Sequence, residues 1–428
     1  MAMAAAAAKA GLGALSGCMP VATLADVGPQ SQPVADDELT SQTSADHELP
    51  AEALADSGLT PKAYVPNVAM MPTYTPTPTS TPVPPPTGPR VVHVHGSTST
   101  FWSGQTDFWN YVRQDTVNTM ADRGLMALTG TASVANAWRA LLPNYRAGQG
   151  IAIKVNFNNS TSCSDSDGQI DGLIQPVNAL VRGMKQMGVA ETDIWVYDAS
   201  RRLPARFVGG CLYSGVQFID PACNLNGGYA SWASTDPHAF VTYHHPTNPS
   251  MPRTRISDVL IDATYLINMP IMKPHRIARV TLTFKNHFGN ISEPWELHPY
   301  IGMSSPTYRS DYSPLVDIYR NAHVGAKTIL VVGDALLAAK DFDAAPAASW
   351  ATFGNKPPQS LFFATDPVAA DCVMADHLRA ELGSSDEGIP SAAYDYLRLA
   401  AAAGLGEYEQ GDPWHAGYSH IDYLKIEV

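Results

Sequence analysis

The chain has 428 residues, of which 45% are hydrophobic, 16% charged and 9% aromatic, and its formal net charge is −13. This acidic balance argues against a nucleic-acid partner, because binding to phosphates requires a basic face. The composition is that of a globular protein, and the chain is long enough to bury a large core.

The first 18 residues resemble the leader of an exported lipoprotein. Residues 1–17 are rich in Ala, Gly and Leu, and Leu15-Ser-Gly precedes Cys18. This pattern is similar to a lipobox, where the leader is cleaved and the cysteine becomes acylated; a chance cysteine after small residues is the alternative. Since no later run of about 20 apolar residues exists, we expect contact with a membrane only through this lipid anchor. The predicted location is extracytoplasmic, at the cell surface or in the periplasm.

Residues 19–89 form the second predicted segment, a disordered linker. It carries eight acidic residues against one lysine, Lys62, and shows no hydrophobic periodicity. A Thr/Pro-rich run from Pro72 to Thr87 favours an extended polyproline conformation. We expect this linker to form a stalk for the folded domain that follows, residues 90–428.

Strand and helix signals alternate from residue 90 onward. Strands are predicted at 91–95, 151–157, 194–198, 216–219, 240–244, 265–271, 328–334, 361–365 and 421–428, the last at an edge. Helices are predicted at 107–123, 134–142, 173–187 and 367–382. This alternation predicts an α/β fold with a mostly parallel sheet flanked by helices. The apolar runs at 328–334 and 361–365 are typical of buried parallel strands.

Four cysteines follow Cys18, and they are Cys163, Cys211, Cys223 and Cys372. None belongs to a CxxC motif, so we expect no iron–sulfur cluster or zinc ribbon. Cys211 and Cys223 lie in one Gly-rich loop and are predicted to pair in an oxidising compartment. Cys372 falls in an apolar helical pattern and is predicted to be a buried thiol.

Three predicted strands end in an aspartate, namely Asp198, Asp334 and Asp366. The carboxyl ends of parallel strands form the ligand crevice of open α/β sheets, so these carboxylates are candidates for holding a divalent cation or for general-base chemistry. Each could instead cap the helix behind it. Asp366, which precedes Pro367, fits a helix cap best.

The densest group of basic and amide side chains lies between residues 266 and 290. Its members sit beside apolar residues and are Asn268, Lys273, His275, Lys285, Asn286, His287 and Asn290. Lysines placed by apolar surroundings predict a carboxylate or phosphate partner; structural pairs with the strand-end aspartates are the alternative. Lys154 and Asn156 add a lysine and an amide from a further apolar strand.

Two other clusters have spacings that occur in metal sites. His93 and His95 place two imidazoles on one side of a strand, which suits Zn or Cu, although an edge-strand histidine pair is common. Asp165, Asp167 and Asp171 resemble part of a calcium loop without its closing Glu. A polar loop that caps the following helix explains these aspartates equally well.

Several of these motifs occur in one order along the chain. They are Ile153-Lys154-Val155-Asn156, Asp198 at a strand end, the segments 265–275 and 281–289, and Asp366-Pro-Val-Ala-Ala-Asp371. In this order they resemble the family of domain of unknown function 362, over roughly residues 150–382. The resemblance implies one shared region, built from Lys154, Asn156, Asp198, Lys273, His275, Lys285, Asn286, Asp366 and Asp371, but no settled reaction. Some family members are associated with iron–sulfur modules, and this chain departs from them because it lacks a suitable cysteine set.

We expect the domain to be an enzyme that acts on an anionic small molecule or on an anionic group of a larger substrate. The candidate catalytic residues are His275, as the proton-transfer group near neutral pH, together with Asp198 and Lys285. The candidate ligand-binding residues are Lys154, Asn156, Lys273, Asn286 and Asp366. A divalent metal held by Asp198 and Asp334 is the candidate cofactor. The alternatives are a lipoprotein that binds an anion or a metal without turnover, and a structural surface module.

Overall fold

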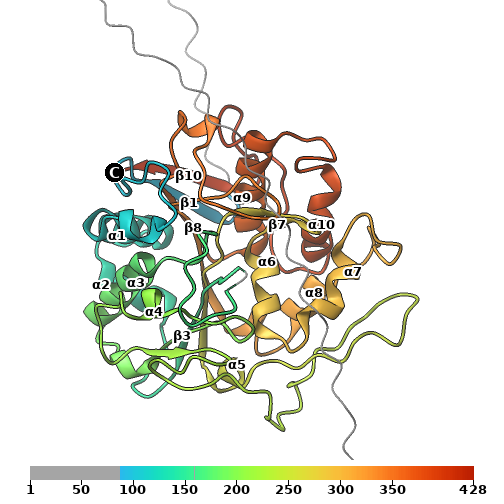
Figure 1. The fold of residues 1–428 in the computed structure, drawn as a ribbon, viewed down its shortest axis with the longest axis horizontal. Helices are drawn as coiled ribbons and strands as arrows, with labels where there is room; N and C mark the ends of the chain where they lie inside the picture. Colours follow the sequence, from blue (N-terminus) through green and yellow to red (C-terminus); the bar gives the residue numbers. More distant parts are fainter. Residues whose placement is uncertain (1–86, 159) are drawn as a thin grey trace, which may run out of the picture. The chain divides into compact units, whose positions relative to one another are not determined.

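The computed structural model describes residues 87–158 and 160–428, which build an α/β fold around one large sheet (Figure 1). The predicted leader, the candidate lipidation residue Cys18 and the linker up to residue 86 lie outside the described residues. Eight strands form the sheet in the order β10-β1-β9-β8-β5-β2-β3-β4, and β6 pairs with β7 separately. The strands are β1 (Arg90–His95), β2 (Ile151–Lys154), β3 (Ile194–Tyr197), β4 (Gln217–Ile219), β5 (Tyr265–Asn268), β6 (Lys273–His275), β7 (Arg279–Thr281), β8 (Thr328–Ala335), β9 (Ser360–Ala364) and β10 (Asp422–Glu427).

Helices and short 3-10 turns connect the strands. The α-helices are α1 (Gln114–Thr129), α2 (Val134–Leu141), α3 (Ile174–Met187), α4 (Ala205–Val208), α5 (Asp258–Asp262), α6 (Thr283–Asn286), α7 (His298–Ile301), α8 (Pro314–Arg320), α9 (Pro367–Leu382) and α10 (Asp395–Ala402). The 3-10 turns are η1 (Phe108–Tyr111), η2 (Glu191–Asp193), η3 (His287–Asn290), η4 (Pro294–Leu297), η5 (Gly325–Lys327), η6 (Ala351–Phe353) and η7 (Ser391–Tyr394). Among the residues that the structure describes, no helix is both long enough and apolar enough to cross a bilayer.

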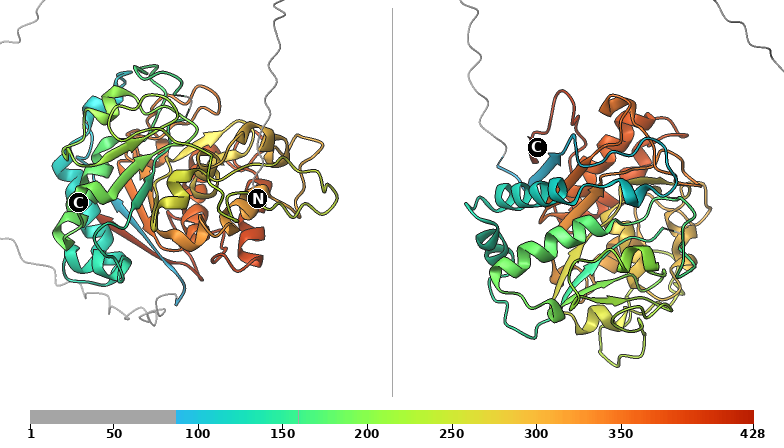
Figure 2. Two further views of the ribbon diagram at one scale, coloured as in Figure 1. Left: turned by 90° about the horizontal axis from the view of Figure 1, so that it is seen from below. Right: turned by 60° about the vertical axis from the view of Figure 1, so that its left-hand side comes forward.

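Helices cover both faces of the sheet, as predicted (Figures 1 and 2). Because successive side chains of a strand point to opposite faces, neighbouring residues enter different cores. Val92 and Phe363 pack in the core under α1, α2 and α3. Val91 and Phe362 belong to the core on the other face, with residues of α8, α9 and α10. The inner strands are therefore covered on both faces, which explains their nearly continuous apolar runs, whereas the edge strand β10 is partly exposed.

The sheet is mostly parallel, but β9 is antiparallel to both of its neighbours, β1 and β8. The prediction that residues 361–365 form a parallel strand was therefore wrong. A parallel return needs a crossover connection, which is usually a helix. The connection 336–359 contains the 3-10 turn η6 and no α-helix, so the chain comes back in the opposite direction.

Two further predicted elements differ from the structure. Residues 240–244 make one isolated bridge, Phe240 to Arg255, and no strand. Prolines are frequent in this loop, and each removes a backbone donor that a ladder requires. The helix predicted at 107–123 is interrupted, since Val112 and Arg113 are extended between η1 and α1.

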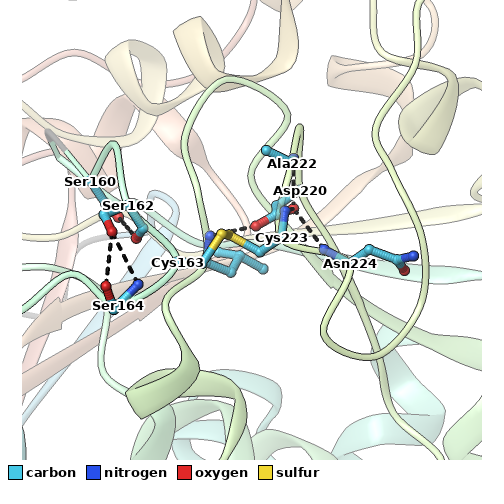
Figure 3. The surroundings of a disulfide bond; sticks show 9 residues. Ser160, Ser162, Cys163, Ser164, Asp220, Ala222, Cys223 and Asn224 are labelled. Atoms are coloured by element: carbon cyan, nitrogen blue, oxygen red, sulfur yellow. Dashed lines mark hydrogen bonds between the residues drawn. A yellow bond between two sulfur atoms is a disulfide. The ribbon is translucent and has the colours of Figure 1, made fainter.

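The disulfide joins Cys163 to Cys223, with a Cα–Cα distance of 5.5 Å (Figure 3). The predicted partner Cys211 is a free thiol, so the predicted Cys211–Cys223 pair was wrong. The loops after β2 and β4 both leave the carboxyl ends of parallel strands in one half of the sheet, and they meet there across 60 positions of sequence. Cys372 is a buried free thiol, as predicted.

Candidate functional site

A cavity of about 280 Å³ lies at the carboxyl ends of β2 and β3, where the chain order of the sheet reverses. From β2 the chain passes outward through β3 and β4, and it then returns to β5 on the other side of β2. Ligands of open α/β sheets bind at such reversal points. The lining residues are Lys154, Asn156, Phe157, Asn158, Asp198, Ser200, Arg201, His275, Thr281, Lys285, Asn286, Phe288, Gly289, Pro294 and His298.

Lys154 is fully engaged by neighbouring oxygens. Its Nζ donates to the backbone carbonyl of Val155 at 2.5 Å, to a carboxylate oxygen of Asp198 at 3.1 Å and to Oδ1 of Asn286 at 3.3 Å. The side chain is 1% exposed. Burial lowers the pKa of Lys154, while the Asp198 carboxylate acts in the opposite direction. All three ammonium donors therefore have acceptors inside the protein.

Asp198 holds the backbone that follows β3. One carboxylate oxygen accepts from Lys154 and from the backbone N–H of Phe157, at 3.4 Å. The other oxygen accepts from the backbone N–H groups of Ser200 and Arg201, at 2.9 and 3.1 Å, and from the Ser200 hydroxyl. A carboxylate with five donors has little capacity left for a metal or for a proton from substrate. Asp198 thus fixes the backbone of Ser200 and Arg201, which also line the cavity, and the catalytic role predicted for Asp198 stays a prediction.

Asn286 connects this pair to a deeper polar network. Its amide nitrogen donates to Oδ1 of Asn268 at 2.7 Å, and Asn268 in turn contacts Nε2 of His287 at 3.1 Å. Burial, followed by the Lys154 charge, lowers the pKa of His287 to about 3. We call Lys154, Asp198 and Asn286 the paired group, because each of these side chains is buried and forms hydrogen bonds within the protein.

Gly289 allows the paired group to pack. A Cβ atom at this position would lie 2.4 Å from Nζ of Lys154 and 2.9 Å from Oδ1 of Asp198. The backbone carbonyl of Gly289 also accepts from the N–H of Ala199 at 3.0 Å. A side chain at this position would force Lys154 to move where η3 crosses the end of β3.

Asp371 of α9 positions the short helix α6, which carries Lys285 and Asn286. Its carboxylate accepts from the backbone N–H groups of Thr283 and Phe284, at 2.7 and 3.2 Å. These are orphan donors of the first turn of α6, and a buried acceptor satisfies them. Burial raises the pKa of Asp371 to about 6. Asp371 therefore acts on the cavity through the backbone of α6.

Lys285 is buried like Lys154 but lacks the hydrogen-bond acceptors that Lys154 has among the described residues. Its Nζ makes no hydrogen bond or ion pair with any described residue, and it lies 3.8 Å from the centroid of the Phe288 ring. The residue is 9% exposed. Burial lowers its pKa far below the ordinary value, and the charges of Lys273, Arg201 and Lys154 lower it further. A buried lysine without a counter-anion faces this cavity.

Two other donors in the cavity are also unpaired. The Thr281 hydroxyl is buried and has no hydrogen-bond partner. Arg201 donates from Nε to the carbonyl of Asn158 at 3.0 Å, and its two terminal nitrogens bond to no described residue. We call Lys285, Thr281 and Arg201 the open group. Each of its three side chains keeps at least one donor that no acceptor among the described residues takes.

His275 and His298 stack at 5.7 Å between ring centroids. Nδ1 of His275 accepts from two backbone N–H groups, so the neutral ring carries its proton on Nε2. Burial and the charge of Lys285 lower the pKa of His275 well below its ordinary value, and they lower that of His298 to about 4. These influences disfavour the charged form of His275, and its predicted role as a proton-transfer group near neutral pH stays a prediction. Its Nε2 is placed as a neutral N–H donor.

The remaining candidate ligand-binding residues fall into two groups. Asn156 lines the cavity, and its side-chain amide makes no hydrogen bond with the described residues. Lys273 and Asp366 lie outside the cavity lining. Burial lowers the pKa of Lys273 to about 8, while the nearby Asp171, Asp341 and Asp343 oppose this.

Asp366 caps α9, with its carboxylate accepting from Val368 and Ala369 at 2.8 and 2.9 Å. This is the helix-cap alternative that the following proline favoured. As a ligand-binding candidate for the cavity, Asp366 was misplaced.

The predicted metal sites are absent from the described residues, where no cluster of three or more His, Cys, Asp or Glu side chains could hold an ion. Asp334 is not part of the cavity lining and accepts from the backbone N–H of Leu173 at 3.2 Å, and burial raises its pKa to about 7. It therefore does not join Asp198 around a cation. His93 uses both ring nitrogens, on Tyr423 and Ser360, and Asp171 pairs with Arg206 at 2.6 Å.

Comparison with known proteins adds the family. Residues 151–376 match the model of a family described as Domain of unknown function (DUF362). The chain belongs to this family. Every residue that lines the cavity falls within the part that matches DUF362, which begins at β2 and ends inside α9. A search of the curated proteins finds no significant relative. The DUF362 part therefore contains the whole cavity together with Asp371, which positions α6.

Sequence reasoning assigned no individual role to several cavity residues, among them Arg201, Thr281 and His298. Arg201 had a usable signal, because it follows the strand-end Asp198 by three positions and an aspartate there turns the backbone. His298 lies beyond the polar segment that drew attention, and its contact with His275 depends on where α7 packs. No local pattern distinguishes Thr281 from an ordinary strand threonine.

Proposed function

We propose that this protein binds the anionic group of a small molecule, or of a larger substrate, in the cavity between Lys285 and Arg201. The observation that carries the proposal is Lys285, a buried lysine on the cavity wall whose charged neighbours are other cations. An ammonium in such a place either finds an anion or loses its proton, because burial without a counter-charge costs several kcal/mol. Among the described residues that line the cavity, the carboxylate of Asp198 is already shared by five donors.

The chemistry of the open group fits a carboxylate or phosphate. The two free nitrogens of Arg201 form a planar fork that matches two anionic oxygens. The Thr281 hydroxyl, the Asn156 amide and Nε2 of His275 supply further neutral donors. An anion beside Lys285 would raise the pKa of that lysine, so binding would take up a proton. We expect the affinity for an anion to increase as the pH falls through the lowered pKa of Lys285.

Calorimetric titration with sulfate and inorganic phosphate tests the proposal. The full chain should bind one anion, and Lys285→Met should weaken binding at least tenfold, equivalent to about 1.4 kcal/mol. Lys356→Met is the matched control, because Lys356 is exposed and lies outside the cavity lining. Equal affinity in the wild type and in Lys285→Met, or no binding in the wild type, contradicts the proposal.

A binding protein without turnover is the second candidate function. The engagement of Asp198 by five donors favours it, since a general base needs a free carboxylate. Chemistry at this site would then have to come from the open group or from the two imidazoles. Turnover of any anionic substrate that is lost in Asp198→Asn while sulfate affinity persists would contradict this candidate.

We also propose that the protein is exported and anchored through a lipid on Cys18. The Cys163–Cys223 bond supports export, because disulfides persist in oxidising compartments. Membrane fractionation of cells that express the full chain, followed by mass spectrometry of the N-terminal peptide, should find acylated Cys18. Cys18→Ser should release the protein from the membrane fraction, and an unmodified Cys18 in membrane-bound protein would rule the anchor out.

A further inference from the structure

We propose that Lys285 forms an imine with an aldehyde or ketone that also carries a carboxylate or phosphate group. The inference rests on the proposed anion site and adds the class of substrate that the site takes. The carbonyl carbon would bond to Nζ of Lys285, while Arg201 holds the anionic group. The same cavity would thus contain both the binding group and the nucleophile.

The position of Nζ suits a nucleophile. Lys285 lies on the cavity wall and is 9% exposed, so its amine is sheltered from bulk water but open to a small molecule. The amine makes no hydrogen bond with any described residue, which leaves its lone pair available. The nearest ring face, that of Phe288, lies 3.8 Å away and holds the side chain without competing for that lone pair. Lys154, by contrast, spends all three of its donors on protein oxygens.

Burial and the neighbouring charges disfavour the protonated form of the Lys285 amine. Burial is the largest influence, and Lys273, Arg201 and Lys154 all disfavour another positive charge. No acidic group offsets them among the influences on Lys285, whereas Lys154 has Asp198 and Lys273 has Asp171. Desolvation beside other cations is a known way to convert a lysine into a nucleophilic amine near neutral pH.

The proposed step balances without an oxidant or a reductant. The amine lone pair adds to the carbonyl carbon, and the carbonyl π electrons move to the oxygen, which takes up a proton. The nitrogen then loses a proton, giving a neutral carbinolamine. The hydroxyl group takes up a second proton and leaves as water while the nitrogen lone pair forms a protonated C=N bond to Nζ, and the nitrogen then releases its remaining proton. Lysine and carbonyl compound thus give imine and one water molecule.

Two neutral donors are placed to assist the oxygen that leaves. The Thr281 hydroxyl is buried without a partner, and Nε2 of His275 carries a proton because Nδ1 accepts two backbone N–H groups. Both residues line the cavity with Lys285. A cavity of about 280 Å³ suits a small substrate, because pockets for drug-sized ligands begin at about 300 Å³. A small oxo acid or a phosphorylated ketose fragment has the required size and both functional groups.

Borohydride trapping tests the inference, because hydride reduces an imine to a stable secondary amine. The full chain would be incubated with pyruvate, glyoxylate or dihydroxyacetone phosphate, reduced, digested and mapped by mass spectrometry. We expect at least one of the three probes to label Lys285, and sulfate to suppress this labelling. Labelling by the two oxo acids alone assigns a carboxylate to the site, and labelling by the ketose phosphate alone assigns a phosphate.

Two variants separate this inference from the anion site on which it rests. Lys285→Arg keeps the cation and removes the nucleophile, so it should still bind sulfate but show no adduct at position 285. Lys356→Met should be labelled at Lys285 as strongly as the wild type. Sulfate binding without any adduct at Lys285 overturns the imine and leaves the anion site standing. Adducts confined to exposed lysines overturn the imine in the same way, and failure to bind sulfate overturns both proposals.

Discussion

Lys154 and Lys285 are both buried lysines beside one cavity, but their hydrogen-bond and charge partners differ. Lys154 donates three hydrogen bonds and is paired with Asp198, so its charge is neutralised within the fold. Lys285 has no acceptor among the described residues and is surrounded by other cations. The difference lies in their partners, and it separates a lysine that supports the structure from one that is left free for a ligand.

The difference also changes what each substitution should do. Removing one partner of a buried ion pair leaves an uncompensated charge and is strongly destabilising. Removing a buried charge that has no partner relieves the protein of a cost, so an apolar replacement is expected to be neutral or stabilising. The free energy of unfolding therefore distinguishes the two groups independently of any ligand.

The largest expected effect is that of Lys154→Met. It leaves the buried Asp198 without its cation and should lower the free energy of unfolding by about 3–5 kcal/mol. Lys285→Met, measured by urea unfolding under the same conditions, should change it by less than about 1 kcal/mol or raise it. Similar losses in both variants would remove the distinction between the paired and the open group.

Removing the disulfide with Cys163→Ala and Cys223→Ala should cost about 4 kcal/mol, because the bond closes a loop across 60 positions. The backbone carbonyl of Cys163 also accepts a hydrogen bond from the backbone N–H of Ala205, a few residues after Arg201. Sulfate affinity should therefore fall as well, since Arg201 loses its support. Cys211→Ala, at the free thiol, is the control and should cost less than about 1 kcal/mol. Equal melting temperatures of the double variant and the Cys211→Ala control under non-reducing conditions would contradict the assigned pairing.

Gly289→Ala tests how tightly the paired group is packed. The new Cβ would lie 2.4 Å from Nζ of Lys154, so the lysine would have to move, at an expected cost of about 1–3 kcal/mol. Gly172→Ala, whose Cβ would approach the Asn156 carbonyl no closer than 3.3 Å, should cost less. Chemical denaturation gives the free energy of unfolding of both variants. A larger loss in Gly172→Ala than in Gly289→Ala would show that the paired group can move to accommodate the new Cβ.

The smallest expected effect concerns Lys273. This lysine is buried like Lys154 and Lys285, and it has acidic neighbours but makes no hydrogen bond with the described residues. Its pKa in the folded protein is about 8, below the ordinary 10.5. Between these values the unfolded chain binds more protons, so stability should rise with pH, by up to about 1 kcal/mol per pH unit. Lys273→Met should flatten this part of the pH profile of unfolding. An unchanged slope would mean that Lys273 keeps its ordinary pKa.

Much of the fold could be predicted because it depends on patterns that are local in sequence. The apolar runs of β1, β2, β3, β5 and β8, the amphipathic helix α3 and the apolar helix α9 were visible in the sequence pattern. The helix cap by Asp366 was visible for the same reason, since the residue and the two N–H groups it binds lie within three positions. The direction of β9 depended on the lack of a helix in the preceding connection, a weaker signal.

The candidate site could be predicted as a group of residues but not as a set of roles. The ends of β2 and β3 brought Lys154 and Asp198 to one place with Lys285 of α6, as the sequence indicated. The contacts that decide their roles join residues far apart, such as Lys154 and Asn286, separated by 132 positions. Asp371 reaches the start of α6 across 88 positions. Periodicity carries no information on such pairings, so the sequence could not tell which lysine would be free.

The parallel pairing of β1 with β10 has a consequence for how the domain responds to force. The first strand of the domain and the last one lie side by side over six residue pairs, from Arg90 with Asp422 to His95 with Glu427. Because the two strands run in the same direction, pulling the domain by its two ends would load these hydrogen bonds in shear. They would have to break together instead of one after another. A protein held at one end and drawn at the other would meet its strongest resistance at the start of unfolding.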